Sequence, residues 1–184
     1  MIMYHQCGEL VIFKWRIYMK LPQSSRLTYR LISRSEEDRK LLETLDTNPI
    51  NREFFPNGAL DKHQIPTMVE RFVGGYGKYQ TPVFLVFDKQ ENFIGRAGFA
   101  YTEELDVVEM GYVLDYKFWG KGYATEIANT LLEWARSSLE YKEVFAFTGV
   151  DHIASITIMK KTGMEYVETR TLKGIECVLY KKNL

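Results

Sequence analysis

A strand, a glycine-containing turn, a long helix and a second strand follow one another in the second half of this 184-residue sequence. This order constrains the fold more than any other feature. The helix is the clearest element, because apolar residues recur at spacings of three and four from Ala124 to Leu139. Runs typical of strands, Val107–Leu114 and Glu143–Thr148, flank it. Two strands joined by a helix in this way lie parallel in one sheet, so the sequence predicts a βαβ unit.

Shorter elements surround this unit. The strand-like runs Val83–Phe87 and Phe93–Tyr101 precede Val107–Leu114 with only short turns between them, which is typical of an antiparallel meander. A short strand is expected around Tyr29, and a closing hairpin over residues 164–181. We therefore expect a single α/β (α+β) domain with a mixed, mostly antiparallel central sheet flanked by helices.

Three further helices are expected around these strands. Ser35 precedes the acidic residues Glu36, Glu37 and Asp38, which is typical of an N-cap and first helical turn. The next helix has Pro66 in its first turn. We expect the glycine-rich run 74–77 to close that helix as a C-cap and turn. The spacing of apolar residues favours a short helix over His152–Lys161.

The composition excludes several classes of protein. The 24 basic and 24 acidic side chains give a formal net charge of zero, so no global basic field points to nucleic acid. A hydrophobic content of 46% is too high for a disordered chain. No apolar run reaches the length of about 18 residues that a membrane span needs, and the start lacks a signal peptide's features. We expect a cytoplasmic protein with no membrane partner. Two cysteines and three dispersed histidines give no metal-ligand spacing, so no metal is expected.

The turn before the long helix is the most informative stretch for function. Gly120 and Gly122 remove Cβ atoms where the chain enters the helix. The free N–H groups of the first helical turn, next to the positive end of the helix dipole, form an anion site suited to a pyrophosphate. The P-loop pattern is absent, and the dinucleotide pattern GxGxxG fails at Thr125. From these residues alone, a ligand site and a tight turn without a ligand both stay open.

The residues around this turn resemble motif A of the GNAT acetyltransferases. Lys117–Ala124 (KFWGKGYA) is similar to the motif Q/R-x-x-G-x-G/A. Glu109–Val113 together with Trp119–Glu126 resembles the RimJ/RimL branch, the ribosomal-protein-alanine N-acetyltransferases and their relatives, which read E-x-G-Y-x-L and Y-W-G-K-G-Y-A-T-E there. Ala154–Met164 is similar to that branch's N-x-A-S and K-x-G-F stretch, and Ser25–Arg30 to its opening T-E-R-L-x-L-R. The similarity implies a GNAT domain over residues 25–182, after an extension of uncertain role at residues 1–20.

The resemblance implies an acetyl-CoA-dependent N-acetyltransferase in which an amine attacks the thioester directly. The strand that carries Tyr112, Val113 and Leu114 would hold the pantetheine through backbone groups and supply the oxyanion donor. His152 stands where the family has an Asn that contacts the pantetheine. The pyrophosphate would bind backbone N–H groups of Trp119, Gly120, Lys121, Gly122, Tyr123, Ala124 and Thr125.

The reaction also needs side chains that move protons. An amine must lose a proton before it attacks a thioester, and Glu109 is the best candidate for the general base, with a salt-bridge role as its alternative. Ser155 would reach the leaving sulfur or cap its own helix. His152 would replace the family's Asn, act as a base, or be purely structural. Met159 occupies the position where many GNAT enzymes carry a Tyr general acid, so the general acid stays unassigned.

The acceptor is less defined by the sequence than the acetyl donor, because acceptor loops vary on one scaffold. Phe54, Phe55 and Tyr76 are expected on the acceptor side. The leading hypothesis is a protein N-terminal α-amine, such as that of a ribosomal protein. A small-molecule amine (a polyamine, an amino acid or an antibiotic) is the first alternative. The second is a module that binds acetyl-CoA without catalysis.

Overall fold

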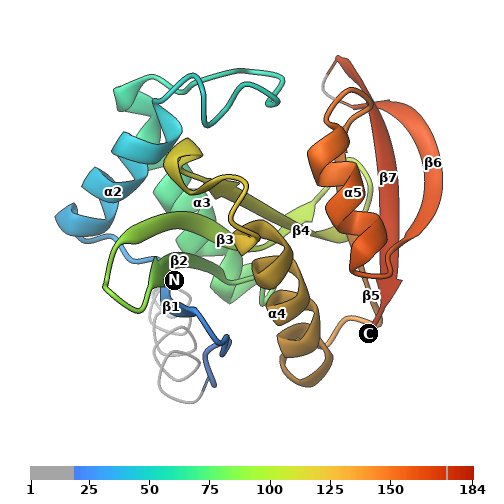
Figure 1. Cartoon of the computed structure of the whole chain (residues 1–184), viewed down its shortest axis with the longest axis horizontal. Helices are drawn as coiled ribbons and strands as arrows, with labels where there is room; N and C mark the ends of the chain where they lie inside the picture. The colour runs from blue at the N-terminus through green and yellow to red at the C-terminus, as the bar shows by residue number, and fades with distance from the viewer. Residues whose placement is uncertain (1–18, 173) are drawn as a thin grey trace, which may run out of the picture.

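The computed structural model describes residues 19–172 and 174–184. Its centre is a seven-stranded sheet with the order β1-β2-β3-β4-β5-β7-β6 (Figure 1). The strands are β1 (Leu27–Leu31), β2 (Val83–Asp88), β3 (Phe93–Thr102), β4 (Val107–Leu114), β5 (Glu143–Gly149), β6 (Glu165–Leu172) and β7 (Ile175–Asn183). The α-helices are α2 (Glu36–Asp46), α3 (Ile65–Lys78), α4 (Tyr123–Ser138) and α5 (Ile153–Lys161). The predicted mixed, mostly antiparallel sheet with flanking helices is confirmed.

The centre of the sheet opens between β4 and β5. Strands β1 to β4 form the predicted antiparallel meander. Strands β4 and β5, joined through α4, are parallel as predicted, and they are in register where Glu109 faces Phe145. Within the described residues this register does not extend towards Leu114 and Gly149. One edge of β4 is therefore left without a neighbouring strand in the half that leads to the glycine turn.

The sheet separates two apolar cores, because successive residues of a strand point to opposite faces. In β2, Phe84 and Val86 belong to the core beneath α4 and α5. Val83 and Leu85 belong to the core beneath α2 and α3. The predicted apolar stripe of α4 is buried against the first core; its members include Ile127, Ala128, Leu131, Leu132 and Ala135. Each large side chain buried in this way contributes about 1.5–3 kcal/mol, which fixes α4 firmly on β4.

The glycine-rich run in α3 was expected to end the helix, and this prediction is wrong. The helix continues through residues 74–77 to Lys78, and none of these glycines has a positive φ. A Cβ at Gly75 would lie 3.0 Å from Oγ1 of Thr81. The missing side chain at Gly75 thus allows the segment after the helix to approach it closely, which is a packing role rather than a turn role.

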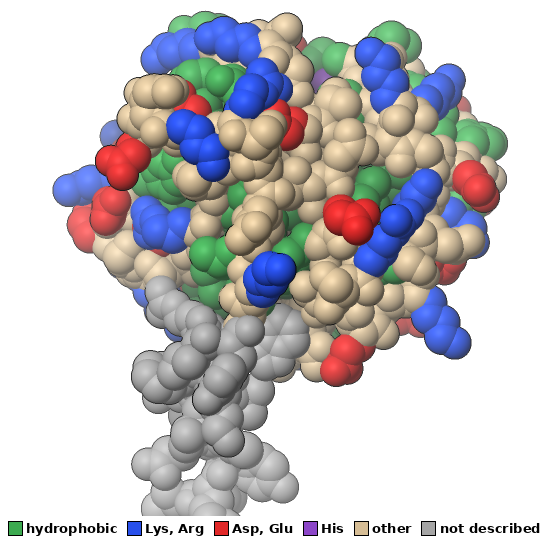
Figure 2. All heavy atoms as spheres, turned by 60° about the horizontal axis from the view of Figure 1, so that its bottom comes forward, with side chains coloured by type: hydrophobic (Ala, Val, Ile, Leu, Met, Phe, Trp, Pro, Cys, Tyr) green, Lys and Arg blue, Asp and Glu red, His purple; other side chains and the backbone are tan. Residues whose placement is uncertain are grey.

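Ser35 caps α2 as predicted, since its side chain accepts a hydrogen bond from the N–H of Asp38. Residues 1–18 of the predicted N-terminal extension lie outside the described residues. Its last residue, Lys20, accepts a hydrogen bond of 2.6 Å from Nε1 of Trp134 in α4. No helix in the described part of the chain is long and apolar enough to cross a membrane. Basic and acidic side chains are interspersed on the face shown in Figure 2.

Candidate active site

The turn from β4 into α4 is built by short-range hydrogen bonds. Asp115 caps a 3-10 turn at Tyr116–Phe118 by accepting from the N–H of Lys117 at 3.1 Å. Nε1 of Trp119 donates to the carbonyl of Leu114 at 3.0 Å, which folds the turn back onto the end of β4. The glycines predicted to enter the helix then adopt left-handed conformations, with φ of 73° at Gly120 and 78° at Gly122. L-residues with a Cβ rarely adopt such angles, so both positions favour glycine.

The first turn of α4 fits an anionic group such as a pyrophosphate. Its N-cap is Gly122, which has no side chain to satisfy the N–H groups of the helix end. A Cβ at Gly120 would meet no heavy atom within 4 Å, so the space beside this backbone is open. The Arg26 guanidinium lies 3.5 Å from where a Cβ of Gly122 would stand. Backbone donors, the positive helix end and a nearby cation therefore meet at one place.

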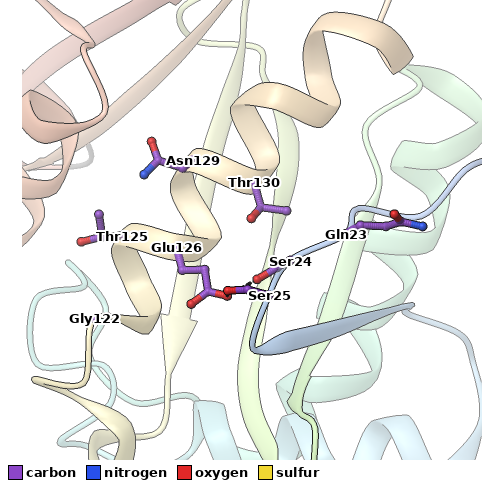
Figure 3. Close-up of a pocket in the computed structure, with 8 residues that line it drawn as sticks. All are labelled: Gln23, Ser24, Ser25, Gly122, Thr125, Glu126, Asn129 and Thr130. Atoms are coloured by element: carbon purple, nitrogen blue, oxygen red, sulfur yellow. Dashed lines mark hydrogen bonds between the residues drawn. The ribbon is translucent and has the colours of Figure 1, made fainter.

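Glu126 ties the segment before β1 to this helix. Its carboxylate accepts hydrogen bonds from the hydroxyls of Ser24 and Ser25 and from Nε of Arg26, the last at 2.6 Å. Burial would raise the pKa of Glu126, but these hydrogen bonds lower it to about 2. Figure 3 shows Glu126 pointing at Ser24 and Ser25, while Thr125 and Asn129 project from the other side of α4. An open pocket lies here, lined by Gln23, Ser24, Ser25, Gly122, Thr125, Glu126, Asn129 and Thr130.

The role of Arg26 and Glu126 was not foreseen from the sequence. Both lie in stretches that carry the family resemblance: Arg26 in Ser25–Arg30 and Glu126 in Trp119–Glu126. The Nη1 group of Arg26 donates to the carbonyl of Lys121 at 3.0 Å, and its guanidinium lies 4.6 Å from the ring centroid of Tyr123. Arg26 therefore holds the glycine turn from outside as well as adding positive charge.

The two faces of β4 carry different chemistry. Glu109, Gly111 and Val113 share one face, since they alternate along the strand. This is the face of α2 and α3, because Arg96, which faces Val113 across the ladder, reaches Asp46 at the end of α2. Glu109 is half-buried there, with its Oε2 atom enclosed by protein.

Tyr112 lies on the opposite face of β4, packed against the core of α4 and α5. Its hydroxyl lies 3.5 Å from Oγ of Ser155 in α5. Burial raises the pKa of Tyr112, so its hydroxyl keeps its proton over the neutral range. Ser155 is the third residue of α5, and the helix N-cap is His152, so Ser155 is not the cap that the alternative interpretation required.

His152 joins the two sides of the opening at the end of β5. Its Nδ1 atom lies 3.0 Å from Oγ1 of Thr148, and its ring stacks on Phe54 with centroids 3.8 Å apart and an interplanar angle of 5°. Burial lowers the pKa of His152, and the Asp151 carboxylate offsets part of this effect. The imidazole is therefore neutral at pH 7. Phe54 comes from the loop between α2 and α3, which in Figure 1 reaches towards α5.

A buried polar network holds that loop. Asp46 accepts hydrogen bonds from Arg52 at 2.8 Å and from Arg96 at 2.8 and 2.9 Å. Nε of Arg52 also donates to the carbonyl of Gly58 at 2.6 Å. This hydrogen bond closes the part of the loop between these two residues. Asn51 donates to the carbonyl of Leu45 at 3.0 Å and accepts from the N–H of Tyr116 at 2.9 Å. The loop is thus connected to the turn that precedes α4.

The predicted site residues fall into one region with few exceptions. Glu109, Tyr112, Val113, Leu114 and the turn from Trp119 to Thr125 follow one another along β4 and into α4, and His152 and Ser155 lie across the opening. Phe54 is the one loop aromatic in contact with His152 among the described residues. Phe55 instead lies under the Arg52 guanidinium, 4.2 Å from it. Tyr76 is a core residue whose hydroxyl donates to the carbonyls of Ile32 and Val83, so its expected acceptor role is wrong.

The described residues contain no group of three or more His, Cys, Asp or Glu side chains able to hold a metal ion. The network around Asp46 was missed because its members are separated by up to 50 positions in the sequence. The Phe54–His152 stack joins residues still further apart. Neither contact has a periodic or motif-like signature that a reading of one sequence detects.

Comparison with known proteins adds an independent observation. The family model "Acetyltransferase (GNAT) domain" matches residues 26–165. The uncharacterized protein YkkB of Bacillus subtilis is 30% identical over 152 residues, which cover 78% of this chain and 86% of that protein.

Solved acetyltransferases share the fold. The enzyme from Salmonella typhimurium that modifies the N-terminal serine of the 50S ribosomal subunit protein L7/L12 gives a TM-score of 0.72 at 16% identity, covering 89% of this chain and 98% of that one. The spermidine N-acetyltransferase from Vibrio cholerae, in complex with CoA and spermine, gives a TM-score of 0.70 at 15% identity, covering 85% and 95%. The two structures thus show one scaffold on proteins with unlike acceptors.

Proposed function

Since the chain belongs to the GNAT acetyltransferase family, we propose that it transfers an acetyl group from acetyl-CoA to a primary amine, by direct attack of the amine on the thioester. One observation carries the proposal. An uncapped helix N-terminus with two left-handed glycines stands where β4 and β5 separate. An elongated ligand with a pyrophosphate at one point and an amide-containing arm fits this combination of donors and open strand edge.

The donor side is formed by β4, the glycine turn and α4. The N–H groups from Gly120 to Thr125 bind the pyrophosphate, whereas the N–H of Trp119 donates to the carbonyl of Tyr116 at 3.1 Å. Arg26 and Lys121 add positive charge. The open edge of β4 at Tyr112–Leu114 offers backbone groups to the pantetheine and a donor for the oxyanion. His152 replaces the family's Asn at the opposite side of the opening. Acetyl-CoA supplies an acyl group that is already activated as a thioester.

The acceptor side is formed by the other face of β4. Glu109 accepts the proton of the incoming ammonium, directly or through one water molecule, because only the neutral amine attacks. The half-buried position of Glu109 strengthens its electrostatic interaction with a bound cation. The strand therefore separates the base from the leaving group, with the reacting carbon between them.

The leaving thiolate receives a hydrogen bond or a proton from the α5 side of the site. Ser155 donates a hydrogen bond or a proton to the sulfur, and the nearby Tyr112 hydroxyl is placed to restore that proton. Both groups lie on the face of β4 opposite Glu109. This arrangement supplies an acid without a tyrosine at Met159, which is buried in the core.

A protein N-terminal α-amine is the proposed acceptor. The support is the resemblance to the RimJ/RimL branch together with the fold shared with the enzyme that modifies the N-terminal serine of L7/L12. A small amine is the second candidate, favoured by the equally clear fold match to the spermidine enzyme. Both acceptors require the same base and the same donor site.

The test is an acceptor screen. The protein is incubated with acetyl-CoA and a panel of peptides with free N-termini, polyamines and amino acids, and thiol release and acetylated products are followed by mass spectrometry. We expect amine-dependent thiol release with a mono-acetylated α-amine. Acetyl-CoA binding without thiol release on any amine would instead identify a non-catalytic binding module.

A further inference from the structure

The acceptor face of β4 presents an uncovered surface, called the floor below. Glu109, Gly111 and Val113 share this face, and the strand rise places Glu109 and Val113 about 13 Å apart along it. Gly111 is exposed, and a Cβ there would have no heavy atom within 4 Å. The space over Gly111 is therefore free for a substrate, with the base Glu109 at one end.

Guanidinium groups gather beside this floor. Arg96 faces Val113 across the β3–β4 ladder and lies 5.0 Å from the ring centroid of Phe72. Arg71, on the flank of α3, lies 5.4 Å from the centroid of the same ring. Phe72 thus stands next to both guanidinium groups, and Arg52 joins them through Asp46.

The charges on this face of β4 do not balance. Asp46 is engaged by both Arg52 and Arg96. Burial would raise the pKa of Asp46, but these two guanidinium groups hold it below its ordinary value. Arg71 makes no ion pair with any described residue, and the carboxylates of Glu109 and Asp46 act on it only through space. Three guanidinium groups and two carboxylates leave this face with one surplus positive charge.

Arg71 is also partly withdrawn from water. It reaches solvent on the flank of α3, yet burial, and then repulsion by Arg96, lowers its pKa. A cation in this position gains from an anionic partner more than a fully solvated lysine or arginine does. When Glu109 takes up the proton of the amine, the surplus rises by one further positive charge.

We propose that the acceptor carries a carboxylate close to its amine, and that Arg71 binds this carboxylate while the amine lies over Gly111 beside Glu109. This inference rests on the proposed function and names the substrate class. An acidic side chain in the first residues of a peptide and the carboxylate of a free amino acid share this chemistry. A polyamine does not, because it would bring a second ammonium group to a face with surplus positive charge.

The test compares acceptors that differ in one charge. Peptides that begin with Asp or Glu are compared with the same peptides that begin with Asn or Gln, and free amino acids with their amides. We expect kcat/KM to be about 10- to 100-fold higher for the acidic member of a pair, since a charge-assisted hydrogen bond is at stake. Preference for acidic peptides or for free amino acids distinguishes the two sources of the carboxylate.

Variants of Arg71 test whether this residue causes the preference for an acidic acceptor. Arg71→Met should remove the preference, mostly through KM of the acidic acceptor, while turnover of the neutral acceptor stays within about threefold. Arg71→Lys should keep part of the preference, because it retains the charge without the planar fork. Arg136→Met is the matched control, since Arg136 forms an exposed ion pair with Glu133 on α4.

The outcomes separate this inference from the proposed function. Equal rates for acidic and neutral acceptors, or a preference that survives Arg71→Met, would overturn the carboxylate subsite while leaving acetyl transfer intact. Absence of any acetylated amine in the wild-type protein would overturn the proposed function first.

Discussion

The two faces of β4 pack against side chains of different chemistry. On the side of α4 and α5 the contacts are almost wholly apolar, with Ile127, Leu131 and Ala128 fully buried. On the side of α2 and α3, charged groups such as Asp46 and Arg96 are buried beside apolar residues. Apolar packing does not depend on the charge of individual atoms. A buried ionic network, by contrast, holds particular charged atoms in fixed positions. The helix of the donor side is thus held by apolar packing, with polar contacts at the turn before it, whereas the acceptor side adds a buried ionic network to its apolar core.

The largest expected effect comes from Glu109, the proposed base on the acceptor side. Glu109→Gln keeps the shape of the side chain but removes the proton acceptor, so kcat/KM should fall about 10²–10⁴-fold. The loss should be partly relieved at high pH, where more amine is neutral, and the affinity for acetyl-CoA should not change. Steady-state kinetics with calorimetry of CoA binding checks both points. A folded variant within about threefold of wild type would remove Glu109 from the mechanism.

Stability measurements on both faces sharpen the comparison. Asp46→Asn leaves two buried guanidinium groups without their carboxylate and should cost about 3–5 kcal/mol of unfolding free energy. Leu131→Ala, on the apolar side, should cost about 2–5 kcal/mol. Urea denaturation at neutral pH measures both losses.

The pH dependence should separate these two variants. The pKa of Asp46 is lowered in the folded protein, so its stabilising contribution is present above its ordinary pKa and is lost as the pH falls through the folded-state value. At acidic pH, the difference in unfolding free energy between wild type and Asp46→Asn should therefore become smaller. The difference in unfolding free energy between wild type and Leu131→Ala should stay constant with pH. If both differences stayed constant, Asp46 would not titrate as an ion-paired group.

A smaller effect is expected at the glycine turn. Gly122→Val forces a β-branched residue into a φ of 78°, which costs about 1–2 kcal/mol or more. It also places side-chain atoms beside the N–H groups that we propose to bind the pyrophosphate. CoA affinity should fall at least about tenfold, as measured by calorimetry, while the acceptor face is untouched. Unchanged affinity in a folded variant would mean that the pyrophosphate binds elsewhere.

The smallest effect is expected for the stack that crosses the opening. Phe54→Ala removes the contact with His152, and aromatic pairs of this kind contribute about 0.5–1.5 kcal/mol. We expect a change of about two- to tenfold in KM for the acceptor, with little change in CoA affinity. Phe55→Ala is the control, because Phe55 contacts Arg52 rather than His152. An equal effect of both substitutions would point to the whole loop rather than to the stack.

The donor side was predictable from the sequence to a greater extent than the acceptor side. The apolar period of α4 and the glycines before it are local signals, because backbone conformation and burial of one helix face follow from neighbouring residues. The network of Asp46, Arg52 and Arg96 has no such signal, since charged residues in a sequence are usually solvated. The misread glycines in α3 show the same limit: Gly75 serves a contact with Thr81, which only the tertiary structure reveals.

The hydrogen bond between Arg52 and Gly58 has a consequence for engineering. Arg52 donates to the carbonyl of Gly58. Asn51 donates to the carbonyl of Leu45 and accepts from the N–H of Tyr116. The exposed tip at residues 53–57 is therefore anchored at its base by residues outside it. Within the tip, Phe55 packs on the Arg52 guanidinium and Phe54 stacks on His152, so Glu53, Pro56 and Asn57 are the positions that can be exchanged while these contacts are kept. Libraries confined to these three positions would vary the exposed surface of the loop while keeping the Phe54–His152 stack and the bond from Arg52 to Gly58.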